Sequence, residues 1–137
     1  MHHMSTTTKA GITELGSVIV PVSDQDRALD FYVGLLGFEK RMDDPYGDGL
    51  RWVEVAPAGA TTGISLSVPA EGMEMPIGID TNIVLMTDDI DATHEYLGAH
   101  DVDQDSEVMR MGAPVPPMFF FRDQDGNRLL AVQSGAA

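Results

Sequence analysis

The chain has 137 residues, no cysteine, and a formal net charge of −14 from 22 acidic and 8 basic side chains. This length suits one domain, or two fused half-domains that share a core. The missing cysteines exclude disulfides, thiolate metal sites and a cysteine nucleophile. The acidic charge disfavours nucleic acid and anionic membrane surfaces as partners. No apolar run is long enough to cross a bilayer and no signal segment is visible, so we expect a cytoplasmic protein.

The N-terminal residues MHHM are interpreted as the remnant of an expression tag. Residues 1–13 as a whole are expected to be loose, because they are rich in Ser and Thr. A single domain is predicted over residues 14–134. Its first module spans about residues 15–69, a linker covers 70–80, and a second module spans about 81–133.

The first predicted strand is Ser17–Val22, in which valines alternate on one face. A helix follows, and Ser23 with Asp26 matches a capping box at its start. Apolar residues at helical spacing carry this helix to about Leu36, where Gly37 is a natural stop.

Three more strands are predicted in the first half, separated by polar and Gly-rich turns: Phe38–Met42, Leu50–Ala56 and Gly63–Val68. Residues 43–49 are interpreted as the first of these turns. The Pro-, Gly- and Met-rich segment Pro69–Asp80 has no periodicity and is expected to connect the two halves.

The second half repeats this order of strand, helix and three strands. Asn82–Thr87 is the predicted opening strand, and Asp88 or Asp89 caps a helix that ends near Gly98. Asp125-Gly126 is a strong hairpin signal. The remaining predicted strands are Glu107–Met111, Met118–Arg122 and Arg128–Gln133.

Two runs at opposite ends of this duplicated pattern carry a family resemblance: VSDQDRALDFYVGLLGF at Val22–Phe38 and FFFRDQDGNRLLAVQ at Phe119–Gln133. With them, nearly the whole chain resembles the vicinal oxygen chelate superfamily, which includes glyoxalase I, bleomycin-resistance proteins and extradiol dioxygenases. The resemblance implies an α+β fold in which two βαβββ modules form a curved mixed β-sheet around a cleft. It also implies a homodimer, because another chain often completes the cleft in this superfamily.

Metal-dependent relatives hold a divalent cation in this cleft, usually with His and Glu ligands. The matching positions here, taken from the resemblance, are Ser17, Glu54, Asn82 and Leu130. Only Glu54 is a good ligand among them, so we predict no metal site and no other cofactor. His94 and His100 are expected on the outside of the sheet, where they cannot replace the missing ligands.

A mostly apolar cleft face with a few polar points is typical of a small-molecule pocket. Its predicted ligand-binding residues are Ser17, Trp52, Glu54, Asn82, Arg128 and Leu130, with Phe119 and Phe121 adding aromatic surface. Trp52 would either stack on a ligand or fill the core of the sheet. Glu54 would act as a hydrogen-bond acceptor or a catalytic base, or else form a structural ion pair with Arg128.

Three functions compete. The first is a metal-free binder of a small organic molecule, similar to the drug-sequestering bleomycin-resistance type. The second is a lyase, isomerase or dioxygenase with an atypical metal site or with Glu54 as general base. The third is a structural or regulatory dimer that binds no ligand.

Overall fold

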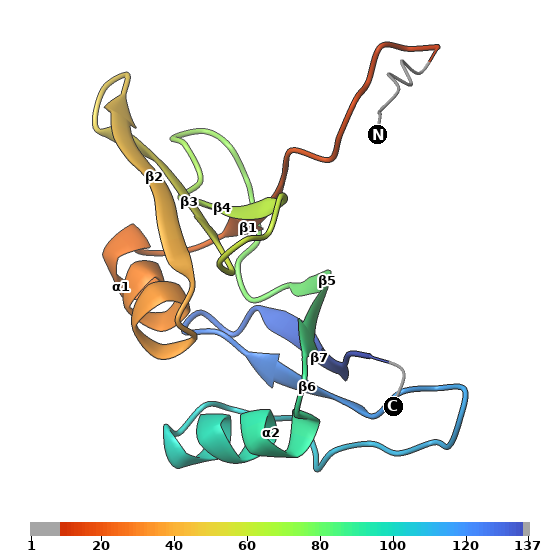
Figure 1. Cartoon of the computed structure of the whole chain (residues 1–137). Coiled ribbons are helices and arrows are strands. Elements are labelled where there is room, and N and C mark those ends of the chain that lie inside the picture. The colour runs from red at the N-terminus through yellow and green to blue at the C-terminus, as the bar shows by residue number, and fades with distance from the viewer. Residues whose placement is uncertain (1–8, 136–137) are drawn as a thin grey trace.

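The computed structural model describes residues 9–135, so the predicted tag remnant lies outside the described residues. In the first half, the elements are β1 (Ser17–Pro21), α1 (Gln25–Leu29), a π-helical continuation (Asp30–Leu35), β2 (Glu39–Tyr46), β3 (Leu50–Ala56) and β4 (Gly63–Ser67) (Figure 1). In the second half, they are β5 (Asp80–Thr87), α2 (Ile90–Ala99), β6 (Met118–Arg122) and β7 (Arg128–Gln133).

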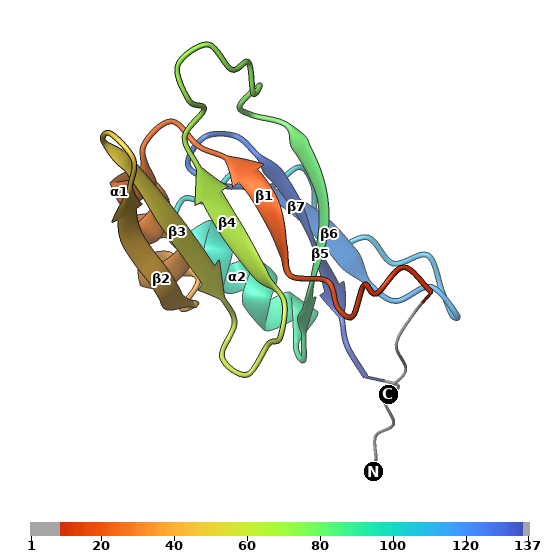
Figure 2. The same ribbon diagram turned by 90° about the horizontal axis from the view of Figure 1, so that it is seen from above.

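The strands confirm the α+β class, but they form two mixed sheets where one curved sheet was expected. The first sheet has the order β1-β4-β3-β2, with β1 parallel to β4. The second has the order β5-β7-β6, with β5 parallel to β7. Figure 2 shows α1 and α2 behind the strands, so the two helices cover the same side of the strand layer. The opposite faces of both sheets remain open.

One hydrophobic core joins the two halves on the helix side of the sheets. Val20, Tyr32 and Val55 from the first half are fully buried in the same cluster as Phe119 and Leu129 from the second. This follows from the strand period of two, which sends alternate side chains to opposite faces. The predicted orientation of the first strand is confirmed, because Val20 is buried while its neighbour Ile19 is exposed.

The first helix begins one residue later than the capping-box prediction implied. Asp24 is the N-cap, and its side chain accepts hydrogen bonds from the backbone amides of Asp26 and Arg27. Ser23 cannot serve as the cap because its hydroxyl donates to Asp125 in the second half. Gly37 ends the helical segment with a φ of 83°, as the sequence predicted.

The second strand is longer than predicted. β2 continues to Tyr46, through a segment that was interpreted as a turn, and pairs with β3 along this length. Proline is tolerated at position 45 because β2 lies at the edge of its sheet. Arg51 on β3 also clamps Asp43 on β2 through two hydrogen bonds of 3.0 and 2.8 Å.

The predicted strand Glu107–Met111 is wrong. In its place, the structure has only isolated bridges, which pair Met109 with Met118 and Gln104 with Phe121. A Gly-Ala-Pro sequence follows directly, and proline cannot donate to a continuing ladder. The predicted second helix is confirmed, with Asp89 as its N-cap.

Candidate functional site: two half-sites on the open sheet faces

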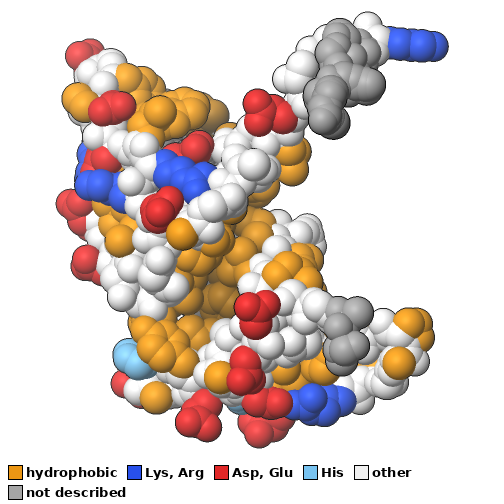
Figure 3. All heavy atoms as spheres, viewed as in Figure 1, with side chains coloured by type: hydrophobic (Ala, Val, Ile, Leu, Met, Phe, Trp, Pro, Cys, Tyr) orange, Lys and Arg blue, Asp and Glu red, His pale blue; other side chains and the backbone are white. Residues whose placement is uncertain are grey.

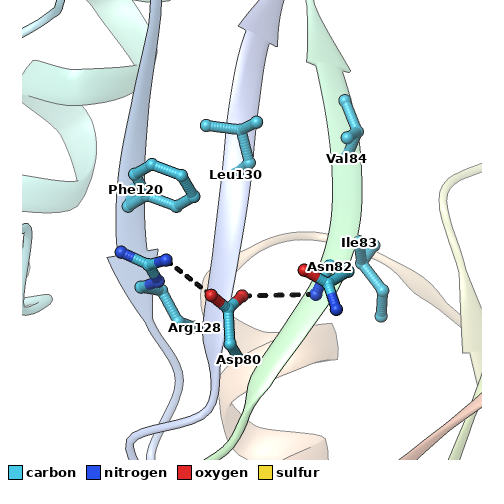
Figure 4. Close-up of a pocket in the computed structure, with 7 residues that line it drawn as sticks. All are labelled: Asp80, Asn82, Ile83, Val84, Phe120, Arg128 and Leu130. Atoms are coloured by element: carbon cyan, nitrogen blue, oxygen red, sulfur yellow. Dashed lines mark hydrogen bonds and ion pairs between the residues drawn. The ribbon is translucent and has the colours of Figure 1, made fainter.

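Six of the eight predicted site residues fall into two groups, one on the open face of each sheet, whereas Phe119 and Phe121 lie in the core. The first half-site comprises Ser17, Ile19, Tyr46, Trp52, Glu54 and Ser65. The second half-site comprises Asp80, Asn82, Val84, Phe120, Arg128 and Leu130, and is drawn in Figure 4. The hollow beside Trp52 and the pocket beside Arg128 have no lining residue in common.

An exposed aromatic pair dominates the first half-site. The rings of Tyr46 and Trp52 meet edge to face, with 6.1 Å between their centroids. Trp52 is 48% exposed, so it does not fill the core of the sheet. It lines a small hollow of about 90 Å³ together with Ser17 and Ile19. Its indole therefore offers a flat apolar surface to an incoming molecule.

Glu54 lies beside this hollow and contacts the hydroxyl of Ser65. Ser65 Oγ lies 3.3 Å from Glu54 Oε1 and 3.1 Å from Ser17 Oγ. The proposed ion pair between Glu54 and Arg128 is wrong, because Arg128 pairs with carboxylates of its own half. Sequence reasoning also missed Gly63, where a Cβ would come within 3.0 Å of Glu54 Cγ. A side chain at position 63 would therefore crowd Glu54.

Arg128 is the centre of the second half-site. Its guanidinium donates to Asp80 at 2.5 Å and to Asp105 at 3.2 Å, and it lies 3.9 Å from the centroid of the Phe120 ring. The hydrogen bond to Asp80 is the largest cause of a raised pKa for Arg128, and the same bond lowers the pKa of Asp80. A pocket of about 210 Å³ opens beside this cation–π pair.

Asn82 lies at an irregular point of β5. The pairing register with β7 shifts between Asp80 and Val84, and Asn82 has a φ of 59°. Asparagine tolerates this left-handed conformation better than most residues. The side chain is exposed in the pocket (Figure 4), where its amide offers both a donor and an acceptor.

The orientation expected for two phenylalanines is corrected by their burial. Phe119 and Phe121 are 0% and 2% exposed and belong to the core on the helix side. Phe120, which lies between them, points to the open face and lines the second half-site (Figure 4). A consecutive run of three phenylalanines gives no sign of which one faces outward. The pairing of Phe120 with Leu130 across the ladder fixes the answer.

The residues at the family's metal positions do not fit a divalent cation. Leu130 has no donor atom, and Ser17 and Asn82 are neutral oxygen ligands on different sheets. Within residues 9–135, no group of three or more His, Asp or Glu side chains is placed to hold a metal ion. His94 packs edge-on against buried Phe119, and His100 bonds the backbone of its own helix at Tyr96.

An apolar groove separates the two sheets. It runs between β1 and β5, has a volume of about 590 Å³, and is lined by side chains that include Leu15, Val18, Ile64, Ile83 and Leu85. Figure 3 shows the hollow between the two halves with mostly apolar walls. Both β1 and β5 are edge strands of their sheets. The core is therefore open to solvent along this groove.

A comparison with protein-family models identifies the class of protein. The family model described as Glyoxalase/Bleomycin resistance protein/Dioxygenase superfamily matches residues 14–130. The chain belongs to this superfamily.

Several proteins resemble the whole chain. The uncharacterized protein YetH of Bacillus subtilis (strain 168) is 33% identical over 121 residues, which are 87% of this chain and 97% of YetH. A superfamily member from Sphaerobacter thermophilus DSM 20745 is 38% identical with a TM-score of 0.79, covering 90% of this chain and 98% of its own. TnmS3, an antibiotic binding protein from Streptomyces sp. CB03234, is 35% identical with a TM-score of 0.75, covering 97% of this chain and all (100%) of its own.

Proposed function

We propose that this protein binds a small organic molecule in a metal-free cleft built from the two half-sites. The proposal rests on the residues at the family's metal positions, which are Ser17, Glu54, Asn82 and Leu130 where His and Glu ligands are usual. Glu54 engages Ser65, Leu130 supplies an aliphatic wall, and aromatic rings flank both sites. A wall of this composition favours binding an organic ligand over coordinating an ion. The antibiotic-binding relative TnmS3 supports the same reading.

The size of each half-site favours their joint use. The hollows measure about 90 Å³ and 210 Å³, whereas pockets for drug-sized ligands measure about 300–1,000 Å³. Neither hollow alone encloses such a ligand. A complete cleft needs a first half-site and a second half-site that face each other, from one chain or from two.

A homodimer is the second part of the proposal. The groove between β1 and β5 leaves part of the core open, and the adjacent side chains Ile19, Val84 and Met86 are each more than half exposed. Contiguous apolar surface of this kind is typical of protein interfaces. A second copy would cover it, since a two-fold axis places the same apolar strip on both partners.

The remaining partners follow from charge. A net charge of −14 supports the absence of nucleic acid and of anionic membranes from the proposed partners. It also favours neutral or cationic ligands over anionic ones. No helix in the described part of the chain is long and apolar enough to cross a membrane. A cytoplasmic location remains part of the proposal.

Elemental analysis of protein purified without a histidine tag tests the metal-free part. We expect less than stoichiometric Zn, Ni, Mn and Fe, and about one metal per chain would overturn it. Sedimentation velocity tests the dimer. We expect a dimer for the unaltered chain and a monomer for Met86→Asp, with Met111→Asp as the control at an exposed residue outside the groove. A monomeric unaltered chain would refute the dimer.

Ligand binding is tested with the neutral dye Nile red and a thermal-shift screen of aromatic and cationic compounds. We expect dye binding that quenches Trp52, the single tryptophan. Trp52→Ala and Glu54→Gln should reduce the ligand-induced thermal shifts, and Met111→Ala should leave them unchanged. Equal shifts in all three variants would refute the cleft as the binding site.

The second candidate is an enzyme that uses Glu54 as a general base. It is favoured by the chain of hydroxyls from Ser65 to Ser17, which could pass a proton along the first half-site. Compounds that bind should be incubated with the protein and analysed by mass spectrometry. Conversion that Glu54→Gln abolishes while binding persists would establish the enzyme, and unchanged compounds would exclude it for those ligands.

A further inference from the structure

The turn at residues 123–127 joins β6 to β7 and holds the buried carboxylate of Asp123. Asp123 is 6% exposed and forms no salt bridge among the described residues. Its Oδ1 accepts hydrogen bonds from the backbone amides of Asp125 and Asn127, both at 2.9 Å. Its Oδ2 accepts from Tyr32 Oη at 2.7 Å and from Asn127 Nδ2 at 3.0 Å. Burying a carboxylate is costly, and here four donors compensate for lost water.

This turn reaches into the first half of the chain at several points. Tyr32 belongs to the π-helical segment and is fully buried. Asn127, with 0% exposure, donates to the carbonyl oxygen of Pro21 at the end of β1. Ser23 donates its backbone amide and its hydroxyl to Asp125, at 2.9 and 2.6 Å. Residues 123–127 thus form hydrogen bonds to the end of β1, to the loop that follows it and to the π-helical segment of the first half.

The same turn also fixes the linker between the halves. Asn127 Oδ1 accepts from the backbone amides of Gly78 and Ile79, at 2.9 and 3.0 Å. Gly78 has a φ of 79°, and a Cβ there would lie 3.3 Å from the carbonyl oxygen of Asp125. Only glycine lets the linker pass this close without strain.

Strands β5 and β7, which carry the second half-site, begin directly after the residues that make these hydrogen bonds. Asp80 follows Ile79 as the first residue of β5, and Arg128 follows Asn127 as the first residue of β7. Asp80 and Arg128 form the ion pair of the second half-site. The second half-site therefore begins directly beside the turn, and the open groove lies between β5 and β1 of the first half.

We propose that residues 123–127 form a positioning anchor that sets the spacing between the two half-sites and so controls ligand affinity without touching the ligand. This inference rests on the proposed function for its effect on affinity, but not for its effect on geometry. Tyr32, Asp123 and Asn127 are positioning residues. Each holds the two halves in one relative orientation from a point on the core side of the sheets.

The absence of cysteine makes the geometry directly measurable. Spin labels on Asp44→Cys and Glu95→Cys report the distance between the halves, because both positions are exposed and lie in different halves. Labels on Asp30→Cys and Asp44→Cys report a distance within the first half. The test variant combines Tyr32→Phe with Ser23→Ala. Tyr96→Phe is the matched control, since it removes a single bond between the halves, from Tyr96 Oη to the Leu35 carbonyl, outside the turn.

In the test variant we expect the mean spin-label distance between the halves to shift, or its distribution to widen, by more than about 2 Å. The distance within the first half and the circular dichroism spectrum should not change, which separates repositioning from unfolding. Tyr96→Phe should behave as the unaltered chain. If the test variant folds and both distances stay unchanged, the anchor is refuted. If Tyr32→Phe with Ser23→Ala does not fold, Ser23→Ala alone is measured under the same criteria.

The affinity for Nile red supplies the second readout. We expect it to weaken about tenfold in the test variant and to be retained in Tyr96→Phe. A changed distance with unchanged dye affinity would refute the control of affinity while leaving the anchor itself in place. Failure of Nile red to bind the unaltered chain would count against the proposed function, whereas the spin-label distances still decide whether the anchor exists.

Discussion

Removal of the Tyr32 hydroxyl should change how stability depends on alkaline pH. The hydroxyl is buried and donates to Asp123. Burial first, and the neighbouring Asp123 carboxylate second, raise the pKa of Tyr32 well above its ordinary value of about 10. In the unfolded chain the phenol ionises near pH 10, but in the folded chain it stays protonated. The unfolded state therefore binds fewer protons above pH 10, and this contribution to stability is lost as pH rises further.

The size of the effect can be worked out from one proton. The unaltered protein should lose about 1.4 kcal/mol of its free energy of unfolding for each pH unit above 10 through Tyr32. Tyr32→Phe removes this loss. At neutral pH the variant is the less stable protein, by about 1.5–3 kcal/mol, because the buried carboxylate of Asp123 loses one donor. For 137 residues, 2 kcal/mol corresponds to a decrease in Tm of about 7 °C.

The assay is urea denaturation of both proteins at several pH values from 7 to 11. Trp52 fluorescence and circular dichroism report the fraction unfolded. The stability gap between the two proteins should be constant up to pH 9 and should shrink above pH 10. The double variant Tyr32→Phe with Asp123→Asn should also lack the decrease in free energy of unfolding above pH 10, because that decrease comes from the Tyr32 phenol. A gap that stays constant to pH 11 would refute the reasoning, since Tyr32 would then ionise equally in both states.

Three further pairs of substitutions test individual packing and backbone arguments by equilibrium unfolding. Gly63→Ala should destabilise by about 1–3 kcal/mol, because the new Cβ lies 3.0 Å from a side-chain carbon and a backbone oxygen of β3, whereas Gly16→Ala meets no atom within 4 Å and should have little effect. Phe119→Ala should cost about 3–5 kcal/mol and Phe120→Ala clearly less, and equal losses would contradict the assignment of Phe120 to the open face. Asn82→Ala should cost about 1–2 kcal/mol because of its φ of 59°, and Asn82→Gly should cost less.

Most of the fold could be predicted because its signals are local. Alternation of valines oriented β1, Gly37 ended the first helix, and Asp89 capped the second. Predictions failed where distant contacts decide. The capping role passed from Ser23 to Asp24 because Asp125, 102 residues away, takes the Ser23 hydroxyl. No local pattern contains that information.

The sheet face on which most of the candidate residues lie was predictable, but their contacts were not. Ser17, Glu54 and Asn82 lie on open sheet faces, as the strand period implied. Their division between two sheets depends on how the halves pack, and the pairing of Arg128 with Asp80 depends on the linker. Gly63 was missed because its importance lies in the space that it leaves for Glu54, which a sequence does not display.

Strand β7 carries core residues and open-face residues in alternation. Asn127, directly before the strand, donates to the Pro21 carbonyl in the first half. Leu129 and Ala131 are buried in the core, whereas Arg128 and Leu130 lie on the open face. Because side chains alternate, a substitution at 128 or 130 leaves the core contacts of its neighbours intact. A different side chain at position 130 should therefore cost little in the free energy of folding. Core residues and candidate site residues thus lie on the same strand, but on opposite faces of the sheet.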